Sequence, residues 1–291
     1  MSRVIPVTNI VRYTCDDGAG LRTTVFLQGC RLHCPWCANP ETISCSNRIW
    51  FDEEICIGSK NGCILNKNCS RSIAEKLRGR SENYMVSCPV NALSYVSKIY
   101  TSEELERSIL LDRSFWGESG GVTFSGGEAV LHMGVLEELL KFLKKQDINI
   151  VFETAGVAPV KSFNKMLSYA DFVYMDIKML SDEAEKVIGL DRDIFLTNLR
   201  ALDASGIDYT IRIPLIRPYT CNRENMERVA EVIAALRIKK AEIFACHDLG
   251  DAKAKRLGIE RRTISGVDEA AIHECKSILS AAGIEVKILR L

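Results

Sequence analysis

The segment Gly29-Cys30-Arg31-Leu32-His33-Cys34-Pro35-Trp36-Cys37-Ala38-Asn39-Pro40 carries three thiols within eight residues, in the spacing Cys-x3-Cys-x2-Cys. It follows the apolar run Thr24-Val25-Phe26-Leu27, so we expect a strand that ends in a cysteine-bearing loop. Three thiolates on one short loop can bind three irons of a 4Fe-4S cluster, whereas an electron-transfer cluster usually takes four cysteines. The remaining iron can then bind a small molecule. We therefore predict a catalytic cluster held by Cys30, Cys34 and Cys37.

Three other chemistries fit parts of this loop. Cys34-Pro35-Trp36-Cys37 could form a thioredoxin-like redox pair, but such a pair begins a long helix, and Pro40 with the polar residues after it predicts none. A structural zinc would need a fourth ligand, for which His33 or Cys45 is available. A disulfide knot would need an oxidising compartment, which nothing in the sequence indicates.

Length and charge limit the classes of function. A chain of 291 residues can bury one sizeable core and carry one small insertion. Its 38 basic and 38 acidic residues balance, which argues against a nucleic-acid partner, because neutralising phosphates requires a basic excess. The first residues contain no apolar signal core, and no run is long enough to span a membrane. We expect a cytoplasmic protein without membrane contact.

Residues 43–98 differ from the rest of the chain, because cysteines occur there among Gly, Asn, Ser and Lys with little apolar periodicity. A segment without a hydrophobic stripe cannot fold by burial alone, so we expect metal to hold it together. We therefore predict two domains. Residues 1–42 and 99–291 form the main domain, and 43–98 form a cysteine-rich insert.

The ligands of the insert are predicted from its last cysteine. Cys88 is followed by proline, as at the end of a bacterial ferredoxin motif. We assign Cys56, Cys63, Cys69 and Cys88 to one auxiliary 4Fe-4S cluster. A zinc site made from the same group of cysteines is the alternative, and Cys45 could replace one of the four ligands.

After the insert, strand and helix patterns alternate. With the strand before the cysteine loop they give six strand-helix units, which predicts an α/β fold with a parallel sheet. No dinucleotide-binding glycine pattern follows the first strand, so a curved, barrel-like sheet is preferred. The expected strands cover 23–28, 121–124, 148–153, 172–178, 208–215 and 241–246, and the expected helices cover 102–111, 130–145, 161–169, 181–204, 223–237 and 269–282.

Polar residues inside these apolar strands share one face. Side chains alternate along a strand, so Asp176 and Lys178 lie opposite the apolar face of their strand, as do Arg212 and Glu153 in theirs. Helices cover the apolar face of a barrel sheet, so these charges should point inward, near the carboxyl ends of the strands. They either bind a charged ligand or form a buried ion network.

The cysteine loop resembles that of the radical SAM superfamily. Upstream, Asp17-Gly18-Ala19-Gly20-Leu21-Arg22-Thr23-Thr24-Val25-Phe26-Leu27-Gln28-Gly29-Cys30 is similar to the signature of glycyl-radical enzyme activating enzymes, the pyruvate formate-lyase activase group. That family usually has Pro at Ala19 and His at Ala38. The resemblance extends to about Gly250. It implies a partial (β/α)6 TIM-like barrel of the radical SAM type with a small ferredoxin-like insert.

The resemblance also implies roles for single residues. The turn Ser125-Gly126-Gly127-Glu128 is similar to the motif that binds the amino group of S-adenosylmethionine (SAM), with Ala129 where proline is usual. Lys178 and Arg212 correspond to contacts with the carboxylate and ribose of SAM. His247, within Ala245-Cys246-His247-Asp248-Leu249-Gly250, corresponds to a histidine that touches the cofactor.

Further positions follow from the same resemblance. Glu153 and Asp176 match residues that help to hold a monovalent cation in the pyruvate formate-lyase activase. Trp36 stands where the family has an aromatic residue near the adenine, although core packing is the default for a tryptophan. The loop from Asp17 would hold the backbone of the target, which makes Asp17, Lys178 and His247 the candidate catalytic residues.

The implied activity is that of an anaerobic oxidoreductase. SAM would be cleaved reductively to a 5'-deoxyadenosyl radical, which takes hydrogen from a glycine of a partner glycyl-radical enzyme. The electron would come from a flavodoxin- or ferredoxin-type reductant. Two alternatives stay open: a radical SAM enzyme that acts on a small molecule or peptide, and a non-catalytic iron-sulfur electron carrier.

Overall fold

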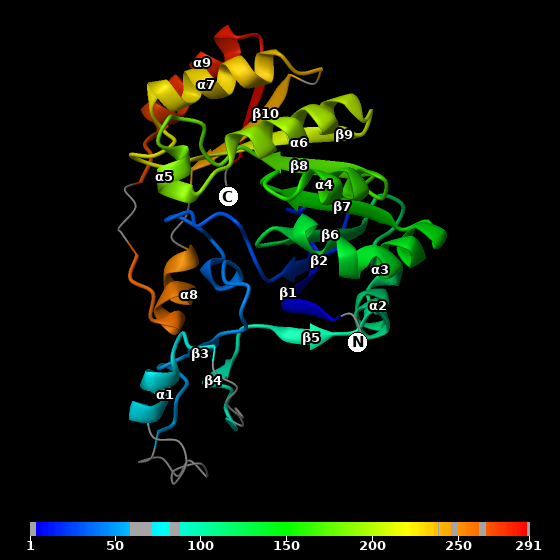
Figure 1. Cartoon of the computed structure of the whole chain (residues 1–291), viewed down its shortest axis with the longest axis vertical. Coiled ribbons are helices and arrows are strands. Elements are labelled where there is room, and N and C mark those ends of the chain that lie inside the picture. Colours follow the sequence, from blue (N-terminus) through cyan, green and yellow to red (C-terminus); the bar gives the residue numbers. More distant parts are fainter. Residues whose placement is uncertain are drawn as a thin grey trace.

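The fold is organised around one large sheet, which Figure 1 shows crossing the molecule. The computed structural model describes residues 4–58, 71–81, 88–237, 239–245, 249–261 and 266–289. Within them the sheet has nine strands in the order β11-β10-β9-β8-β7-β6-β2-β1-β5. Their bounds are β1 Ile5–Thr14, β2 Arg22–Leu27, β5 Lys98–Tyr100, β6 Gly121–Gly126, β7 Asn149–Thr154, β8 Phe172–Asp176, β9 Asp208–Leu215, β10 Lys240–Ala245 and β11 Glu285–Leu289.

β2 and the strands β6 to β11 run parallel to one another. This confirms the predicted α/β class and its six expected strands. β11 adds a further parallel strand that the sequence analysis did not include, because it is short and follows the last predicted helix. β1 and β5 are antiparallel and extend the sheet beyond β2. Residues 5–14, which are not among the expected strands, therefore form a full strand of the sheet.

Helices follow most of the parallel strands and bury their apolar stripes against the sheet. In α3, for example, Leu136, Leu139, Leu140 and Leu143 are fully buried. Polar caps define several starts: Thr101 and Glu104 form a reciprocal capping box at α2, and Asn222 caps α7. The helices are α2 Ser102–Leu110, α3 Met133–Lys145, α4 Val160–Leu167, α5 Ala184–Ile188, α6 Arg192–Ala204, α7 Arg223–Ala234, α8 Leu249–Leu257 and α9 Glu269–Ala281. None of the described helices is both long and apolar enough to cross a bilayer.

The segment predicted as an insert contains a small apolar cluster of its own. β3 (Ile49–Phe51) pairs antiparallel with β4 (Leu93–Tyr95), and α1 (Arg71–Leu77) packs beside them. The segment therefore does bury a small apolar core, which the sequence did not reveal because its strands are too short to show a period; that metal helps to hold it together stays a prediction. The cluster consists of Ile49, Phe51, Ala74, Leu77, Ala92 and Leu93, with Cys56, Cys88, Val90 and Tyr95 packed against it.

Helix α8 lies between this small lobe and the large sheet in Figure 1, and its cations contact both sides. Arg256 pairs with Asp52 at 2.7 Å. Lys253 donates to the Asn39 side chain at 2.6 Å and lies 3.2 Å from the Glu41 carboxylate, directly after the cysteine loop. The sequence analysis predicted no helix here, and this one joins the two parts of the chain.

Arg22, at the first position of β2, is fully buried and fixes the preceding loop. Its guanidinium donates to the Thr123 hydroxyl at 2.8 Å, to the Ala19 carbonyl at 3.0 Å and to the Val122 carbonyl at 2.9 Å. It also donates to the Asn149 side chain at 2.9 Å. Burial lowers the pKa of Arg22 to about 10, still above neutrality. This charge ties the Asp17 to Gly20 loop to the starts of three strands.

We expect Arg22→Leu to lower the free energy of unfolding by about 3 kcal/mol, because it leaves several buried acceptors without donors. Urea denaturation of the cluster-free protein measures this loss. Arg113→Leu is the matched control, since the Arg113 side chain is exposed and, in the part of the chain that the structure describes, donates only to Gln146; it should change stability by about 0.5 kcal/mol or less. Equal losses in both variants would contradict the structural role given to Arg22.

Candidate active site at the carboxyl ends of the parallel strands

The cysteine loop leaves the carboxyl end of β2 and is fixed by backbone hydrogen bonds on both sides. The Gly29 amide donates to the Thr42 carbonyl at 2.6 Å, and the Cys30 amide donates to the Ile43 carbonyl at 3.1 Å. The Gly29 carbonyl accepts from the Glu128 amide at 2.8 Å, which joins the loop to the turn after β6. The thiols are therefore presented by a braced loop.

The three predicted cluster ligands border one cavity of about 340 Å³, a size suited to a small cofactor. Strand ends, the cysteine loop and the glycine turn all contribute to its walls. The lining residues are Asp16, Asp17, Phe26, Cys30, Leu32, Cys34, Trp36, Cys37, Ala38, Asn39, Thr42, Ile43, Ser125, Gly126, Gly127, Glu153, Thr154, Ala155, Asp176, Lys178, Arg212, Pro214, Phe244 and Leu289.

The surroundings of the thiols fit a metal cluster. Burial raises the pKa of Cys30 to about 12 and raises the pKa values of Cys34 and Cys37 as well, with nearby Lys178 opposing only part of the shift. Thiols in such a site become thiolates by binding a metal cation. Among the described residues, no three His, Cys, Asp or Glu side chains converge on a single metal ion. A cluster that bonds each thiolate to its own iron does not need them to converge.

Arg212 on β9 is the centre of the charged network predicted from strand parity. Its Nη1 atom lies 2.5 Å from Glu153 Oε1, and its Nε atom lies 3.3 Å from Glu242 Oε2. Its Nη2 donates to the Asp16 carbonyl at 3.1 Å, and the guanidinium lies 3.5 Å from the ring centre of Tyr174. Burial alone would lower the pKa of Arg212, but the adjacent carboxylates raise it, so the charge is retained.

Lys178 and Asp176, at the end of β8, form a second pair in the same cavity. Lys178 Nζ donates to Asp176 Oδ2 at 2.8 Å. Burial works to lower the pKa of Lys178, yet the adjacent Asp176 carboxylate raises it overall. Glu153 accepts from the Ser125 hydroxyl at 2.6 Å, and its pKa is raised by burial and by the nearby Asp17. The predicted ion network is therefore confirmed, and its members also line the cavity, while binding of a charged ligand by them stays a prediction.

The cofactor role predicted for Glu128 stays a prediction, and the structure shows how its side chain is held. Its carboxylate does not line the cavity, because it accepts hydrogen bonds from the Thr154 hydroxyl at 2.7 Å and from the Ala155 and Val130 amides at 3.0 and 3.2 Å. Burial raises the pKa of Glu128, and these donors oppose the shift. Glu128 therefore positions the glycine turn, while Gly126 and Gly127 face the cavity.

Of the remaining predicted site residues, two line the cavity and three lie outside the described part of the chain. Asp17 borders the cavity and accepts from the Thr24 hydroxyl at 2.6 Å. Trp36 also lines it, with its ring 5.0 Å from that of Tyr219. His247, Cys63 and Cys69 lie outside the described residues, so their predicted roles stay predictions.

Sequence reasoning missed part of the cavity wall. Asp16 contributes a backbone carbonyl, which no side-chain pattern could indicate. Leu289 comes from the unpredicted strand β11. Asn39 belongs to the quoted cysteine segment, and the structure shows how it is held: its side chain accepts from Lys253, and its carbonyl accepts from the Thr42 amide at 3.0 Å and the Thr42 hydroxyl at 2.7 Å.

Comparison with known proteins identifies the family of this chain. Residues 24–233 match the model of the radical SAM superfamily. This chain belongs to that superfamily. It is 30% identical over 289 residues to the pyruvate formate-lyase 2-activating enzyme of Escherichia coli (strain K12), covering 98% of this chain and 92% of the relative. It is 33% identical over 271 residues to the 4-hydroxyphenylacetate decarboxylase activating enzyme of Clostridium scatologenes, covering 87% and 86%.

A solved structure agrees on the fold. A radical SAM methyltransferase from Sphaerobacter thermophilus superposes with a TM-score of 0.57 at 12% identity, covering 99% of this chain and 77% of that one. At this identity the likeness concerns the radical SAM fold alone. The predicted fold class is confirmed.

The relatives also confirm the predicted group within the superfamily, the glycyl-radical enzyme activating enzymes. This radical SAM enzyme is therefore an oxidoreductase that cleaves SAM to generate a glycyl radical in a partner glycyl-radical enzyme. Its family implies a 4Fe-4S cluster and SAM as cofactors. The comparisons support this function over a small-molecule substrate or a non-catalytic electron carrier.

We expect Arg212→Gln to lower the free energy of unfolding at pH 8 by about 3 kcal/mol, because it leaves the Glu153 carboxylate without its arginine partner in a largely buried site, whereas Glu242 keeps its pair with Lys287. An unpaired, buried Glu153 has a folded-state pKa above its unfolded value. The penalty is therefore complete above the folded pKa and shrinks as the pH falls through it. Urea titrations of the cluster-free protein at pH 8 and pH 5 measure both effects.

Arg228→Gln is the matched control for this prediction. Arg228 pairs with Asp182 at 2.7 Å, but the two side chains are 37% and 69% exposed, so the expected change is about 0.5 kcal/mol or less. A loss in Arg212→Gln that is the same at both pH values would show that Glu153 does not carry the effect.

Proposed function

We propose that Cys30, Cys34 and Cys37 hold the catalytic 4Fe-4S cluster, with SAM in the adjoining cavity. The observation that carries this proposal is that the three thiols, the Gly126-Gly127 turn and the strand-end cations border a single cavity. When bound, the cluster and SAM supply an electron and a 5'-deoxyadenosyl radical, which removes the hydrogen of the target glycine. The protein contributes binding, orientation and exclusion of water.

The charged residues of the cavity match the polar groups of SAM. We assign Lys178 to the methionine carboxylate, because its ammonium stays charged and, among the described residues, donates only one of its three N–H groups, to Asp176. The turn backbone at Gly126 and Gly127 is assigned to the amino group. Arg212 has five donors, of which three are occupied, so the rest are available to the ribose. Trp36 and His247 are assigned to the adenosine part.

A monovalent cation is a further part of the proposal. The Glu153 and Asp176 carboxylates line the same cavity, and Asp17 is close enough to Glu153 to raise its pKa. Three carboxylates near one another repel, and a bound cation would relieve that repulsion. We assign this role to Glu153 and Asp176, with Asp17 left to hold the backbone of the target.

The electron source and the auxiliary site are proposed together. We propose a flavodoxin- or ferredoxin-type donor, with an auxiliary 4Fe-4S cluster at Cys56, Cys63, Cys69 and Cys88. Support for the auxiliary site comes from Cys56 and Cys88, which pack against the same small apolar cluster. We propose that the enzyme works in the cytoplasm, where thiols stay reduced.

Cys34→Ala should abolish the electron paramagnetic resonance signal of the reduced catalytic cluster and stop 5'-deoxyadenosine formation, because only two loop thiolates remain. Cys15→Ala is the control, since Cys15 is exposed and does not border the cavity. The variants are reconstituted and assayed anaerobically. Cofactor cleavage that persists in Cys34→Ala would contradict the assignment of the catalytic cluster to this loop.

Asp17→Asn should separate cofactor cleavage from radical transfer. We expect 5'-deoxyadenosine formation within about twofold of the parent, and a glycyl-radical signal on the partner enzyme reduced at least tenfold, because the loop that positions the target loses its charge. An equal fall in both readouts would assign Asp17 to cofactor binding. Spectroscopy of the protein-bound radical and product chromatography give the two values.

A further inference from the structure

We propose that an exposed aromatic pair, Tyr13 and Phe115, anchors the partner glycyl-radical enzyme when it docks. Tyr13 is 48% exposed near the end of β1, and Phe115 is 53% exposed in the segment after α2. Their ring centres lie 4.9 Å apart, edge to face, and Leu111, four residues before Phe115, is 71% exposed. These three side chains are called the Tyr13 patch. The proposal rests on the proposed function, because it concerns the protein that receives the radical.

The backbone that exposes Tyr13 is strained. The pairing register of β1 with β2 shifts between Val11 and Thr14, which marks a bulge in β1. Within this bulge Tyr13 has a φ of 58°, a left-handed conformation that is unusual for an aromatic residue. Bulges near active sites re-aim side chains, and strained residues persist only where the surrounding structure fixes them. The exposure of this ring is therefore imposed by the fold.

A polar network fixes the segments that carry the patch. Arg12, next to Tyr13, donates from Nη1 to Asp112 Oδ2 at 2.5 Å and to the Ser108 carbonyl at 3.0 Å. Asp112 is 1% exposed and also accepts from the Thr23 hydroxyl at 2.7 Å. The end of β1, the end of α2 and the start of β2 are thus joined. Side chains held in place before binding cost less to order when a partner arrives.

The patch lies within the area that a docked partner must cover. Asp16 and Asp17 border the proposed cofactor cavity, and the target glycine has to reach that cavity. Tyr13 is three residues before Asp16, so the two Cα atoms are at most about 11 Å apart. A standard interface covers about 800 Å² on each partner, which corresponds to a disc of about 16 Å radius. An interface centred on Asp16 therefore includes Tyr13.

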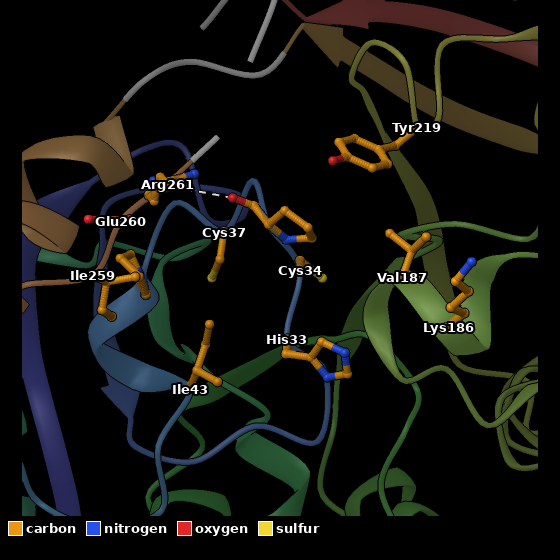
Figure 2. A pocket seen from close by; sticks show the side chains of 12 residues that line it. His33, Cys34, Cys37, Ile43, Lys186, Val187, Tyr219, Ile259, Glu260 and Arg261 are labelled. Atoms are coloured by element: carbon orange, nitrogen blue, oxygen red, sulfur yellow. Dashed lines mark hydrogen bonds between the residues drawn. The ribbon is translucent and has the colours of Figure 1, made fainter. Parts of the chain in front are cut away.

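The other large opening beside the cysteine loop suits a partner less well. This second cavity, of about 500 Å³, does not border Asp16. Figure 2 shows Lys186 on one side of it and Glu260 and Arg261 on the other. Charged residues are depleted at the centre of protein interfaces, whereas aromatic residues are enriched there. The Tyr13 patch has the composition of an interface centre.

The surroundings of the patch indicate the surface that fits it. Exposed charges near it in the sequence have both signs, as in Arg113 and Glu118, so they select neither a basic nor an acidic partner. Burial of the rings and of Leu111 would then supply most of the affinity, against an apolar surface of the partner. Binding should accordingly depend little on salt, because exposed charges contribute little to it.

The test measures binding of a full-length glycyl-radical enzyme to the cluster-loaded protein, without SAM or reductant. The probe is the glycyl-radical enzyme of the same organism that the parent binds most tightly in biolayer interferometry. Phe115→Ser and Tyr13→Asn should each weaken binding at least about tenfold, because aromatic anchors dominate such interfaces. Asparagine tolerates the left-handed conformation, so Tyr13→Asn removes the ring without disturbing the fold.

Ile99→Ser is the matched control. Ile99 is 46% exposed on β5 and lies outside the patch, so binding should stay within about twofold of the parent. Phe115→Leu keeps an apolar side chain and should stay within about threefold. Raising the salt from about 50 to about 300 mM should change the parent affinity less than threefold. Formation of 5'-deoxyadenosine without a partner should be the same in all variants, because the patch does not border the cofactor cavity.

Radical transfer gives a second readout of docking. In Phe115→Ser the partner concentration for half-maximal glycyl-radical formation should rise at least about tenfold, while the rate at saturating partner is retained. A fall in the saturating rate alone would overturn docking in favour of a role in positioning the glycine. Affinities of Phe115→Ser and Tyr13→Asn within twofold of the parent, or an equal loss in Ile99→Ser, would also overturn it.

Two outcomes separate this proposal from its alternatives. A parent dimer in sedimentation velocity that Phe115→Ser dissociates would assign the patch to a second copy of this chain and overturn the proposal. No saturable binding of a glycyl-radical enzyme up to about 50 µM would overturn it as well. Binding that depends on the patch while no glycyl radical forms would leave the docking surface standing and count against the proposed function. A radical formed at the parent rate in both ring variants would do the reverse.

Discussion

The active site depends on the close approach of two backbone segments at Gly29 and Gly127. The Gly29 amide and carbonyl are both occupied, by Thr42 and by Glu128, so the cysteine loop is held between its own return segment and the turn after β6. A Cβ on Gly127 would lie 2.3 Å from the Gly29 carbonyl oxygen, closer than any side chain allows. This contact brings the thiols and the turn to the same cavity.

Charge is the second constraint on the site. Four buried or half-buried ionic side chains point into one cavity, and each is stabilised mainly by another member of the group. Such a network leaves donors of Lys178 and Arg212 available while keeping both groups charged. Polar groups that are held in place before a ligand arrives lower the cost of ordering them on binding.

Strand parity predicted much of this site, because alternation fixes the face of each side chain once a strand is assigned. It correctly placed Glu153, Asp176, Lys178 and Arg212 on one cavity. It could not show that Glu128 turns toward Thr154, since a glycine-rich turn leaves the direction of the next side chain open.

The elements that were missed were short or weakly patterned. β11 and α8 have five and nine residues, and the strands of the small lobe have three each, so their periodicity is hard to detect in a sequence. The burial of Arg261 could not be predicted either, because one buried cation after a helix produces no periodic pattern in the sequence. These features arise from contacts between distant segments.

Helix α8 has a mechanical consequence. Lys253, at the middle of the helix, contacts the return of the cysteine loop at Asn39, and Arg256, near the carboxyl end, contacts the small lobe at Asp52. Gly250, near its start, lies so close to the loop that a Cβ there would be 2.3 Å from the Cys37 carbonyl oxygen. The helix thus connects the two parts directly. A displacement of the small lobe is transmitted to the cysteine loop through α8 and not through the sheet.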